Sequence, residues 1–432
     1  MTAQLIAGLS ILVLIHEFGH FIAARAFKIK VEKFYLFFDA WGFKLFKFKR
    51  GETEYGIGWL PLGGYVKISG MIDESMDKEQ LNQPVQPWEF RAKPAWQRLI
   101  VMLAGVIMNA IFGIIVFSGI LIHYSKQYLP SNEINNGIYA YQLGREVGFK
   151  TGDKIIEIND HKLERFSDVT STRVFFGAKI TINRNGEIKD IILPDTLYKS
   201  FKNGSKEIFI NADNFPLVVD SILPNSGASK AGMLAKDKII SLDSIQINCF
   251  GEWSENIHKF AGKTIPINVL RKNDTITLNV YVDTANTIGI KRGIPPYKLK
   301  EYNYFTALKF GYSDAVEVLV SNAKSLGKII NGEIKARESV GGPIAIAQIY
   351  GASWDWSKFW FITGLLSMVL ALMNILPIPA LDGGHVIFTI IELITGKKFS
   401  DKFMEKAQIV GMIILLALMT FAIGNDIFKL FN

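Results

Sequence analysis

Residues 11–21 read Ile-Leu-Val-Leu-Ile-His-Glu-Phe-Gly-His-Phe, and this stretch contains the pattern His16-Glu17-x-x-His20. On a helix, residues four apart lie on the same face, so both imidazoles can reach one metal ion. Glu17 adjoins the first histidine, where its carboxylate could accept a proton from an attacking water. Zinc suits two imidazoles and a carboxylate with one position left open, so the stretch predicts a metal site that still lacks its third ligand.

The surroundings of this motif are apolar. Apart from the motif, residues 2–24 are almost wholly apolar, and a membrane-spanning helix needs about 20 such residues. Ionisable side chains in a spanning helix are costly and normally face a cavity or bundle interior, where they serve a function. A chance match or a packed histidine is the alternative, but packing does not explain three ionisable groups together. Because no basic segment or small-residue cleavage site is present, we expect a retained span rather than a signal peptide.

The composition indicates a membrane protein with soluble parts. The chain has 432 residues, enough for two or three domains, and its mean hydropathy is +0.21. The net charge of +8 favours contact with an anionic membrane surface over nucleic acid, because no basic patch interleaved with aromatic residues is found. The single cysteine, Cys249, excludes an intrachain disulfide and a cysteine-based metal site.

Three further apolar segments predict spans at residues 99–122, 359–378 and 408–423. Eight lysines and arginines between residues 25 and 50 follow the first span, and four lysines between residues 397 and 406 follow the third. The positive-inside rule places both basic segments, and therefore His20, on the cytoplasmic side. Within the second span, Asn109 is expected to bond across helices, although it could also line a cavity.

A β-hairpin is predicted after the first span. Residues 43–49 partly alternate apolar and basic side chains, Arg50-Gly51-Glu52 reads as a turn, and residues 55–59 form the second strand. Residues 61–66 read as a glycine-rich apolar loop, and residues 71–94 as a polar loop. The hairpin could be a plain surface element, or it could be half-inserted in the membrane with an open edge that holds an extended peptide beside the metal.

An internal repeat dominates the polar middle of the chain. Residues 148–156, Gly-Phe-Lys-Thr-Gly-Asp-Lys-Ile-Ile, recur as residues 232–240, Gly-Met-Leu-Ala-Lys-Asp-Lys-Ile-Ile. Two tandem β-rich domains follow from this repeat. Residues 218–233 resemble the core of a PDZ domain, whereas residues 137–148 lack the Pro-x-Ser-x-Ala pattern and indicate a divergent first copy. PDZ folds bind extended peptides, but these two domains could also act only as spacers or size filters.

A second stretch could supply the missing ligand. Residues 373–385 contain two prolines and two glycines at the end of the third predicted span, followed by Asp382 and His385. Irregular backbone at membrane depth is tolerated only where protein or a water-filled cavity satisfies its polar groups. By spacing alone, Asp382 and His385 are both candidates for the third ligand, and a plain surface loop is the alternative. Residues 302–330 predict an amphipathic helix that lies on the membrane or on the spans.

Together these motifs resemble the site-2 protease family of intramembrane zinc metalloproteases. The resemblance is carried by His16-Glu17-x-x-His20, residues 61–67, the tandem repeat, Gly342-Pro343-Ile344 and Asn374-x-x-Pro377-x-Pro379-x-Leu381-Asp382-Gly383. It implies that His16, His20 and Asp382 hold one Zn²⁺ per chain, that Glu17 is the catalytic base, and that Asn374 lies near bound substrate. His385 falls outside the implied ligand set. Family members often have proline where this chain has Val106.

The predicted fold is a multi-pass α-helical membrane protein with four transmembrane helices, a membrane-associated β-hairpin and two tandem extracytoplasmic PDZ-like domains. Its segments are the first helix (1–26), hairpin and loop (27–98), second helix (99–124), PDZ-like domains (125–200 and 201–293), amphipathic helix and connector (294–354), third helix (355–386), cytoplasmic loop (387–405) and fourth helix (406–432).

The resemblance implies cleavage within single-pass membrane proteins, such as anti-sigma factors already trimmed by another protease, or remnant signal peptides. The expected setting is a bacterial inner membrane, with lipid and the substrate as partners and with no nucleic acid. A catalytically inactive PDZ scaffold and a metal transporter are the alternatives. The complete ligand set together with Glu17 disfavours the scaffold. A transporter needs neither a glutamate beside the first histidine nor tandem peptide-binding domains.

Overall fold

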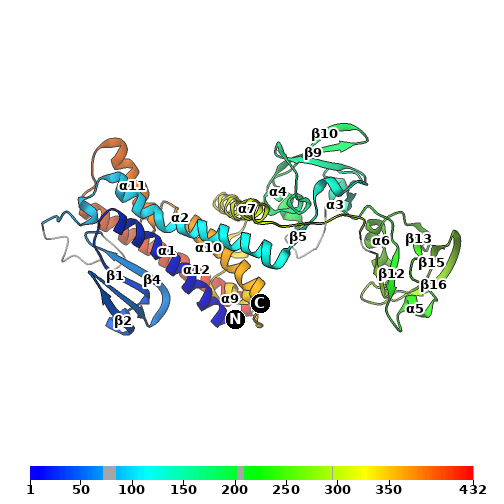
Figure 1. Ribbon diagram of the computed structural model, residues 1–432, viewed down its shortest axis with the longest axis horizontal. Coiled ribbons are helices and arrows are strands. Elements are labelled where there is room, and N and C mark those ends of the chain that lie inside the picture. The colour runs from blue at the N-terminus through cyan, green and yellow to red at the C-terminus, as the bar shows by residue number, and fades with distance from the viewer. Residues whose placement is uncertain (72–83, 202–208, 294, 432) are drawn as a thin grey trace. The chain divides into compact units, whose positions relative to one another are not determined.

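Figure 1 shows a computed structural model that describes residues 1–71, 84–201, 209–293 and 295–431. Part of the predicted polar loop, residues 72–83, lies outside the described residues. The chain divides into two compact units. The helical unit comprises Met1–Lys126 and Tyr302–Asn432, and the repeat unit comprises Gln127–Glu301.

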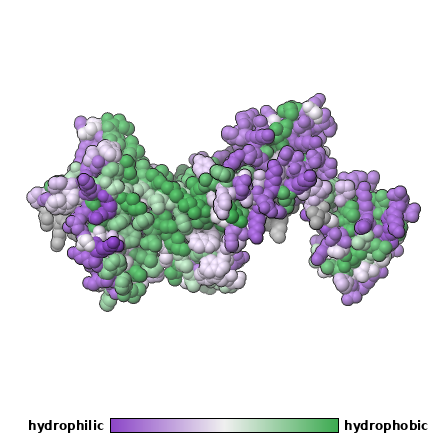
Figure 2. Space-filling model, viewed as in Figure 1, coloured by the Kyte–Doolittle hydropathy of each residue, from purple (hydrophilic) through white to green (hydrophobic). Residues whose placement is uncertain are grey.

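Among the described residues, the helical unit has four helices that are long and apolar enough to cross a membrane. They are α1 (Thr2–Ala26), α2 (Ala95–Ile120, continued by a π-helical turn to Ser125), α10 (Trp356–Asn374) and α12 (Asp401–Phe431). Hydrophobic residues gather over these helices, whereas hydrophilic residues dominate the visible surface of the repeat unit (Figure 2). The prediction of four apolar membrane helices is therefore confirmed.

Helix α2 is central to the helical unit, because it packs against α1, α10, α11 (Asp382–Thr395) and α7 (Tyr304–Ile330). Glycines permit the close approaches: a Cβ on Gly19 of α1 would lie 2.4 Å from the Ala104 carbonyl oxygen of α2. Helix α7 begins with a capping box between Asn303 and Thr306. The predicted amphipathic helix is thus present, and it lies against the spans α2 and α10.

Three shorter helices complete this unit: α8 (Ala336–Ser339), α9 (Pro343–Tyr350) and α11 (Asp382–Thr395). Asp426 of α12 accepts hydrogen bonds from the backbone N–H groups at the start of α9. The prediction of a loop over residues 387–405 is wrong for its first part, since α11 continues to Thr395. Its apolar residues recur at helical spacing, and the first stop signal is Gly396, which takes the left-handed conformation that ends the helix.

A four-stranded sheet lies beside α1, with strand order β2-β3-β1-β4. Its strands are β1 (Val31–Phe38), β2 (Lys44–Arg50), β3 (Thr53–Gly58) and β4 (Leu60–Ile68). Strands β2 and β3 form the predicted antiparallel hairpin, whereas β1 runs parallel to β3 and antiparallel to β4.

Strand β4 corrects the prediction of a glycine-rich loop over residues 61–66. A Cβ on Gly64 would lie 2.7 Å from Val13 Cγ1 of α1 and 2.7 Å from the Tyr35 carbonyl oxygen of β1. The glycine therefore allows the strand to pack tightly between helix and sheet, and it does not mark a loop. Strand β4 stands at one edge of the sheet, so one side of its backbone has no strand partner among the described residues.

In the repeat unit, both copies have a sheet of the same strand order, β10-β9-β7-β8 in the first and β16-β15-β13-β14 in the second. The first copy, with core residues between 134 and 212, contains β6 (Tyr139–Ala140), α3 (Gln142–Glu146), β7 (Lys154–Ile158), β8 (His161–Lys162), α4 (Thr172–Phe175), β9 (Ala178–Arg184), β10 (Glu187–Leu193) and β11 (Ile210–Asn211). The second copy, with core residues between 217 and 288, contains β12 (Val219–Ile222), α5 (Gly227–Lys230), β13 (Lys238–Leu242), β14 (Ile245–Gln246), α6 (Phe250–Asn256), β15 (Thr264–Arg271), β16 (Asp274–Tyr281) and β17 (Ile290–Arg292). The strands β5 (Gln127–Tyr128) and β18 (Lys300–Glu301) pair where the chain enters and leaves the unit.

The repeated aspartate has the same partners in both copies. Asp237 is 1% exposed and accepts hydrogen bonds from Nε and Nη2 of Arg271 and from the backbone N–H of Leu234. The hydrogen bond from Arg271 is the main cause that lowers the pKa of this carboxyl below its usual range. In the first copy, Asp153 and Arg184 form the same bidentate pair. Each copy therefore pairs one buried aspartate with one arginine, although the arginine follows the aspartate by 31 residues in the first copy and by 34 in the second.

The predicted boundary between residues 200 and 201 falls too early. Strand β11 pairs with β6, and Phe209 and Ile210 belong to the core of the first copy. The first copy therefore extends to about residue 212, while residues 202–208 lie outside the described residues. Glu255 of α6 joins the copies, since it accepts hydrogen bonds from Arg145 and from the Tyr139 hydroxyl.

Candidate active site

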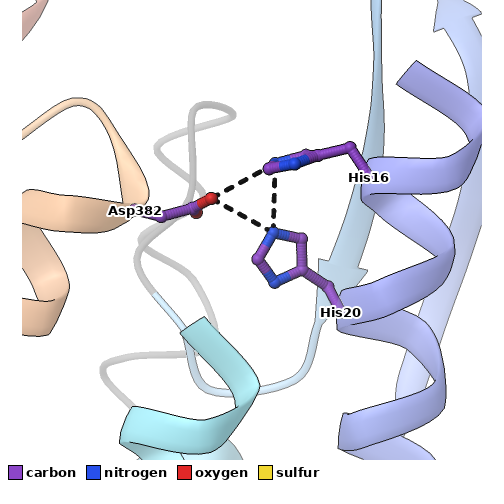
Figure 3. Close-up of side chains that lie close together, drawn as sticks. All are labelled: His16, His20 and Asp382. Atoms are coloured by element: carbon purple, nitrogen blue, oxygen red, sulfur yellow. Dashed lines mark hydrogen bonds and ion pairs between the residues drawn. The ribbon is translucent and has the colours of Figure 1, made fainter. Parts of the chain in front are cut away.

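Figure 3 shows that three side chains converge from two helices. His16 and His20 lie one turn apart on α1, and Asp382 is the first residue of α11. The two Nε2 atoms are 3.2 Å apart, and Asp382 Oδ2 lies 3.2 Å from Nε2 of His16 and 3.4 Å from Nε2 of His20. Among the described residues, these three form the one group of His, Cys, Asp and Glu side chains placed to hold a metal ion together.

The spacing of the three atoms fits a zinc ion. Ligand bonds of about 2.0–2.1 Å at tetrahedral angles separate the ligand atoms by roughly 3.3 Å, close to the three observed separations. Oδ2 of Asp382 is buried and accepts no hydrogen bond in the described part of the chain. A buried oxygen without a donor, facing two imidazole nitrogens, calls for a shared cation. The donor set is the nitrogen and oxygen chemistry that zinc prefers.

The ring of His20 is held by α2. Its Nδ1 lies 2.8 Å from the Val101 carbonyl oxygen, which can only accept, so Nδ1 carries the proton. Nε2 is then unprotonated and free to bind a metal. Gly105, one turn further along α2, provides the space for the ring, because a Cβ there would lie 2.4 Å from Nε2 of His20.

The ring of His16 lies between two asparagine side chains. Nδ2 of Asn109, on α2, is 3.3 Å from Nδ1 of His16, and Nδ2 of Asn374, the last residue of α10, is 3.3 Å from Nε2. Asn374 therefore contacts the group of three, although it is not among the residues that line the neighbouring cavity.

A cavity of about 540 Å³ opens beside the group of three. Glu17 lines this cavity together with the three converging residues, so a carboxylate adjoins the place where a water would react. The cavity also has walls from the sheet and from helices α2, α11 and α12. Its remaining lining residues are Lys33, Phe38, Asp39, Gly64, Tyr65, Val66, Lys67, Ile68, Met71, Met102, Ala380, Leu381, His385 and Gln408.

The two candidates for the third ligand are placed differently. Asp382 points its carboxylate at both histidines and forms the metal-competent group together with His16 and His20. His385 lines the cavity but is not part of this group. The two residues are three apart on α11, so both face the cavity. The sequence spacing therefore cannot choose between them as the third ligand, whereas the observed distances to the histidines do.

The sheet contributes cavity residues to which the sequence analysis assigned no role. Tyr65 and Lys67 of β4 alternate with Val66 and Ile68, which pack in the core beneath. This alternation is the signal that could have identified the strand, but the preceding glycines and proline obscured it. Tyr65 donates a hydrogen bond to Asp39, and burial raises its pKa well above the usual range.

Charges are paired on this sheet. Lys44 donates to Glu54 and lies 3.8 Å from Asp39. The hydrogen bond from Lys44 lowers the pKa of Glu54 to about 2. Asp39, which lines the cavity, therefore belongs to a network of ion pairs on the sheet that also includes Lys33.

Comparisons with known proteins agree with this geometry. A model of peptidase family M50 matches residues 4–418. The regulator of sigma-E protease RseP of Salmonella typhimurium is 28% identical over 453 residues, which cover 99% of this chain and 98% of that protein. The protein of the same name from Escherichia coli is 27% identical over 464 residues, with 99% and 98% covered. A protein of Treponema pallidum named as a candidate zinc metalloprotease is 27% identical over 450 residues, with 98% of both chains covered.

Proposed function

The chain belongs to peptidase family M50 and is a membrane-embedded zinc metalloprotease, and from this premise we propose that it cleaves within the membrane-spanning segments of single-pass proteins. The observation that carries the proposal is the placement of the metal-competent group. His16 and His20 lie on a helix that is long and apolar enough to span a bilayer, so the reaction would take place below the lipid surface.

We assign His16, His20 and Asp382 as the zinc ligands and Glu17 as the base. When bound, the metal supplies Lewis-acid polarisation of the scissile carbonyl and acidifies a water molecule. Glu17 accepts the proton of the attacking water and passes it to the leaving amine. The support for this role is that Glu17 adjoins the first ligand and lines the cavity.

The substrate must be extended before it can react. A transmembrane helix shields its peptide bonds, because every backbone group is already hydrogen-bonded within the helix. Strand β4 borders the cavity and stands at the edge of its sheet, so its backbone could pair with an unwound segment of the substrate by strand addition. The side-chain amide of Asn374 would bond a freed backbone group close to the metal, which is why we assign it to substrate binding.

We further propose the topology and the substrate class. The basic segments that flank the metal motifs favour an active site near the cytoplasmic side of a bacterial inner membrane. The two copies of the repeat would then be extracytoplasmic PDZ-like domains that exclude untrimmed ectodomains. Substrates would be single-pass proteins already shortened by another protease, of the anti-sigma factor type, or remnant signal peptides. The relatives named for the regulation of sigma-E are consistent with the first of these two classes.

Co-expression with tagged single-pass proteins tests the proposal. We expect wild-type protein to cut a panel member within its span and Glu17→Gln to reduce the rate by about 10²- to 10⁴-fold. Zinc content should stay at one ion per chain in the variant, because Glu17 is not a ligand. A panel left intact by wild-type protein, or a variant that cleaves at the wild-type rate, would contradict the assignment.

A further inference from the structure

Asn109 lies at the metal-competent group on a helix that contributes no ligand. The residue is 0% exposed, and its amide nitrogen Nδ2 lies 3.3 Å from Nδ1 of His16. The Asn109 oxygen, Oδ1, is buried and has no hydrogen-bond partner among the described residues. An unpaired buried amide oxygen costs about 1–3 kcal/mol, so this position needs an explanation.

The chemistry of His16 supplies that explanation. If His16 binds zinc through Nε2, as the proposed function requires, its proton must be on Nδ1, and Nδ1 then needs an acceptor. An amide nitrogen is only a donor and cannot serve. A half-turn of the Asn109 amide exchanges Oδ1 with Nδ2 without changing the shape of the side chain. After this exchange the oxygen faces the Nδ1 proton of His16 and accepts it, while the amide NH2 takes the position that the oxygen had occupied.

Helix α2 also provides an acceptor for the Nδ1 proton of His20. The Val101 carbonyl of α2 accepts the Nδ1 proton of His20 at 2.8 Å. Val101, Gly105 and Asn109 are spaced four residues apart, so they form one face of α2, opposite two histidines that are also four residues apart on α1. Gly105, between the two acceptors, leaves the space that both rings occupy. A second contact holds the backbone of Asn109, since the Ser367 hydroxyl of α10 donates to the Asn109 carbonyl oxygen at 2.7 Å.

We propose that Asn109 is a positioning residue for the metal site: its side-chain oxygen accepts the Nδ1 proton of His16 and so holds Nε2 toward the zinc ion. Helix α2 thus orients both histidines, one through a backbone carbonyl and one through a side-chain amide. The inference rests on the proposed ligand role of His16 and adds a residue outside the ligand set. It also explains why a polar side chain occurs in the middle of an apolar span.

Zinc affinity tests the proposal directly. Purified full-length protein in detergent would be titrated with a graded series of zinc chelators, and the free zinc concentration at half-occupancy recorded for each variant. Asn109→Leu keeps the size of the side chain but removes the acceptor, and we expect it to weaken zinc binding by about 10- to 100-fold. Asn109→Asp keeps an acceptor but has no N–H, and we expect it to retain the wild-type affinity or exceed it.

Three controls make the result decisive. Ser118→Ala removes a hydroxyl from the same helix at a bond that stays within α2, and its affinity should equal that of wild type. Thermal unfolding of each zinc-free protein reports whether a variant still folds. If Asn109→Leu binds zinc as tightly as wild type, or if Asn109→Asp loses affinity as strongly as Asn109→Leu, the acceptor role is refuted. His16→Ala distinguishes a failure of the proposed ligand set from a failure of the acceptor role of Asn109. If His16→Ala keeps full zinc affinity, the proposed ligand set itself is wrong, and this inference fails with it.

Discussion

Gly105→Ala should eliminate the metal site by adding one methyl group. A Cβ at this position would lie 2.4 Å from Nε2 of His20 and 2.7 Å from Cε1 of His16. Ordinary carbon contacts begin near 3.5 Å, so the rings would have to retreat by about 1 Å. Metal–ligand bonds tolerate displacements of only about 0.2 Å. We therefore expect Gly105→Ala to lose most of its zinc and at least about 100-fold of its cleavage rate.

The chain offers a matched control for this substitution. Gly119 lies on the same helix, and a Cβ there would meet nothing within 4 Å. Both substitutions replace glycine by alanine in α2, but only the one at Gly105 places a methyl group against the histidines. Zinc would be measured by elemental analysis of purified protein, and cleavage with a tagged single-pass substrate. A Gly105→Ala protein with full zinc content and a rate within about threefold of Gly119→Ala would refute the reasoning.

Two further predictions concern the third ligand and the repeat. Asp382→Ala should purify without zinc, whereas His385→Ala should keep its zinc, because only Asp382 faces both histidines. Elemental analysis of the two purified variants measures this. Loss of zinc in His385→Ala alone would reverse the assignment of the third ligand. Asp237, whose folded pKa is lowered from 3.8, should stabilise the second copy at neutral pH and lose this effect as the pH falls through the lowered value, because protonation breaks the pair with Arg271. Asp237→Asn should cost about 2 kcal/mol at pH 7. It should also make hydrogen-exchange protection of β13 and β15 less dependent on pH than in wild type between 5 and about 2, with the lowered pKa values of Asp283 and Glu255 accounting for the remaining dependence. A variant as acid-sensitive as wild type would contradict this.

The sequence was sufficient for the features that depend on neighbours along the chain. The four apolar helices follow from uninterrupted apolar runs, and the pairing of His16 with His20 follows from a four-residue spacing on one helix. The β2–β3 hairpin follows from its turn and alternation, because such a pair forms between adjacent segments.

The remaining features depend on contacts between distant segments. Strand β4 was mistaken for a loop because Gly64 serves a contact with Val13 that no local pattern records. The extent of the first copy was misjudged because the two-residue strand β11 is defined only by its pairing with β6. The roles of Val101 and Gly105 are likewise invisible in sequence, since a carbonyl and a missing methyl group become meaningful only when α2 lies against α1.

The separation of Asp382 from the histidines has a consequence for biosynthesis. Asp382 follows His16 by 366 residues, and at 5–20 residues per second a ribosome needs roughly 20–70 s to make that interval. With the ligands assigned as proposed, a nascent chain whose first helix is already in the bilayer cannot yet hold its ion. Hydrolytic activity would therefore begin only after the chain has been translated and inserted past Asp382, which protects neighbouring newly made membrane proteins from a half-built protease.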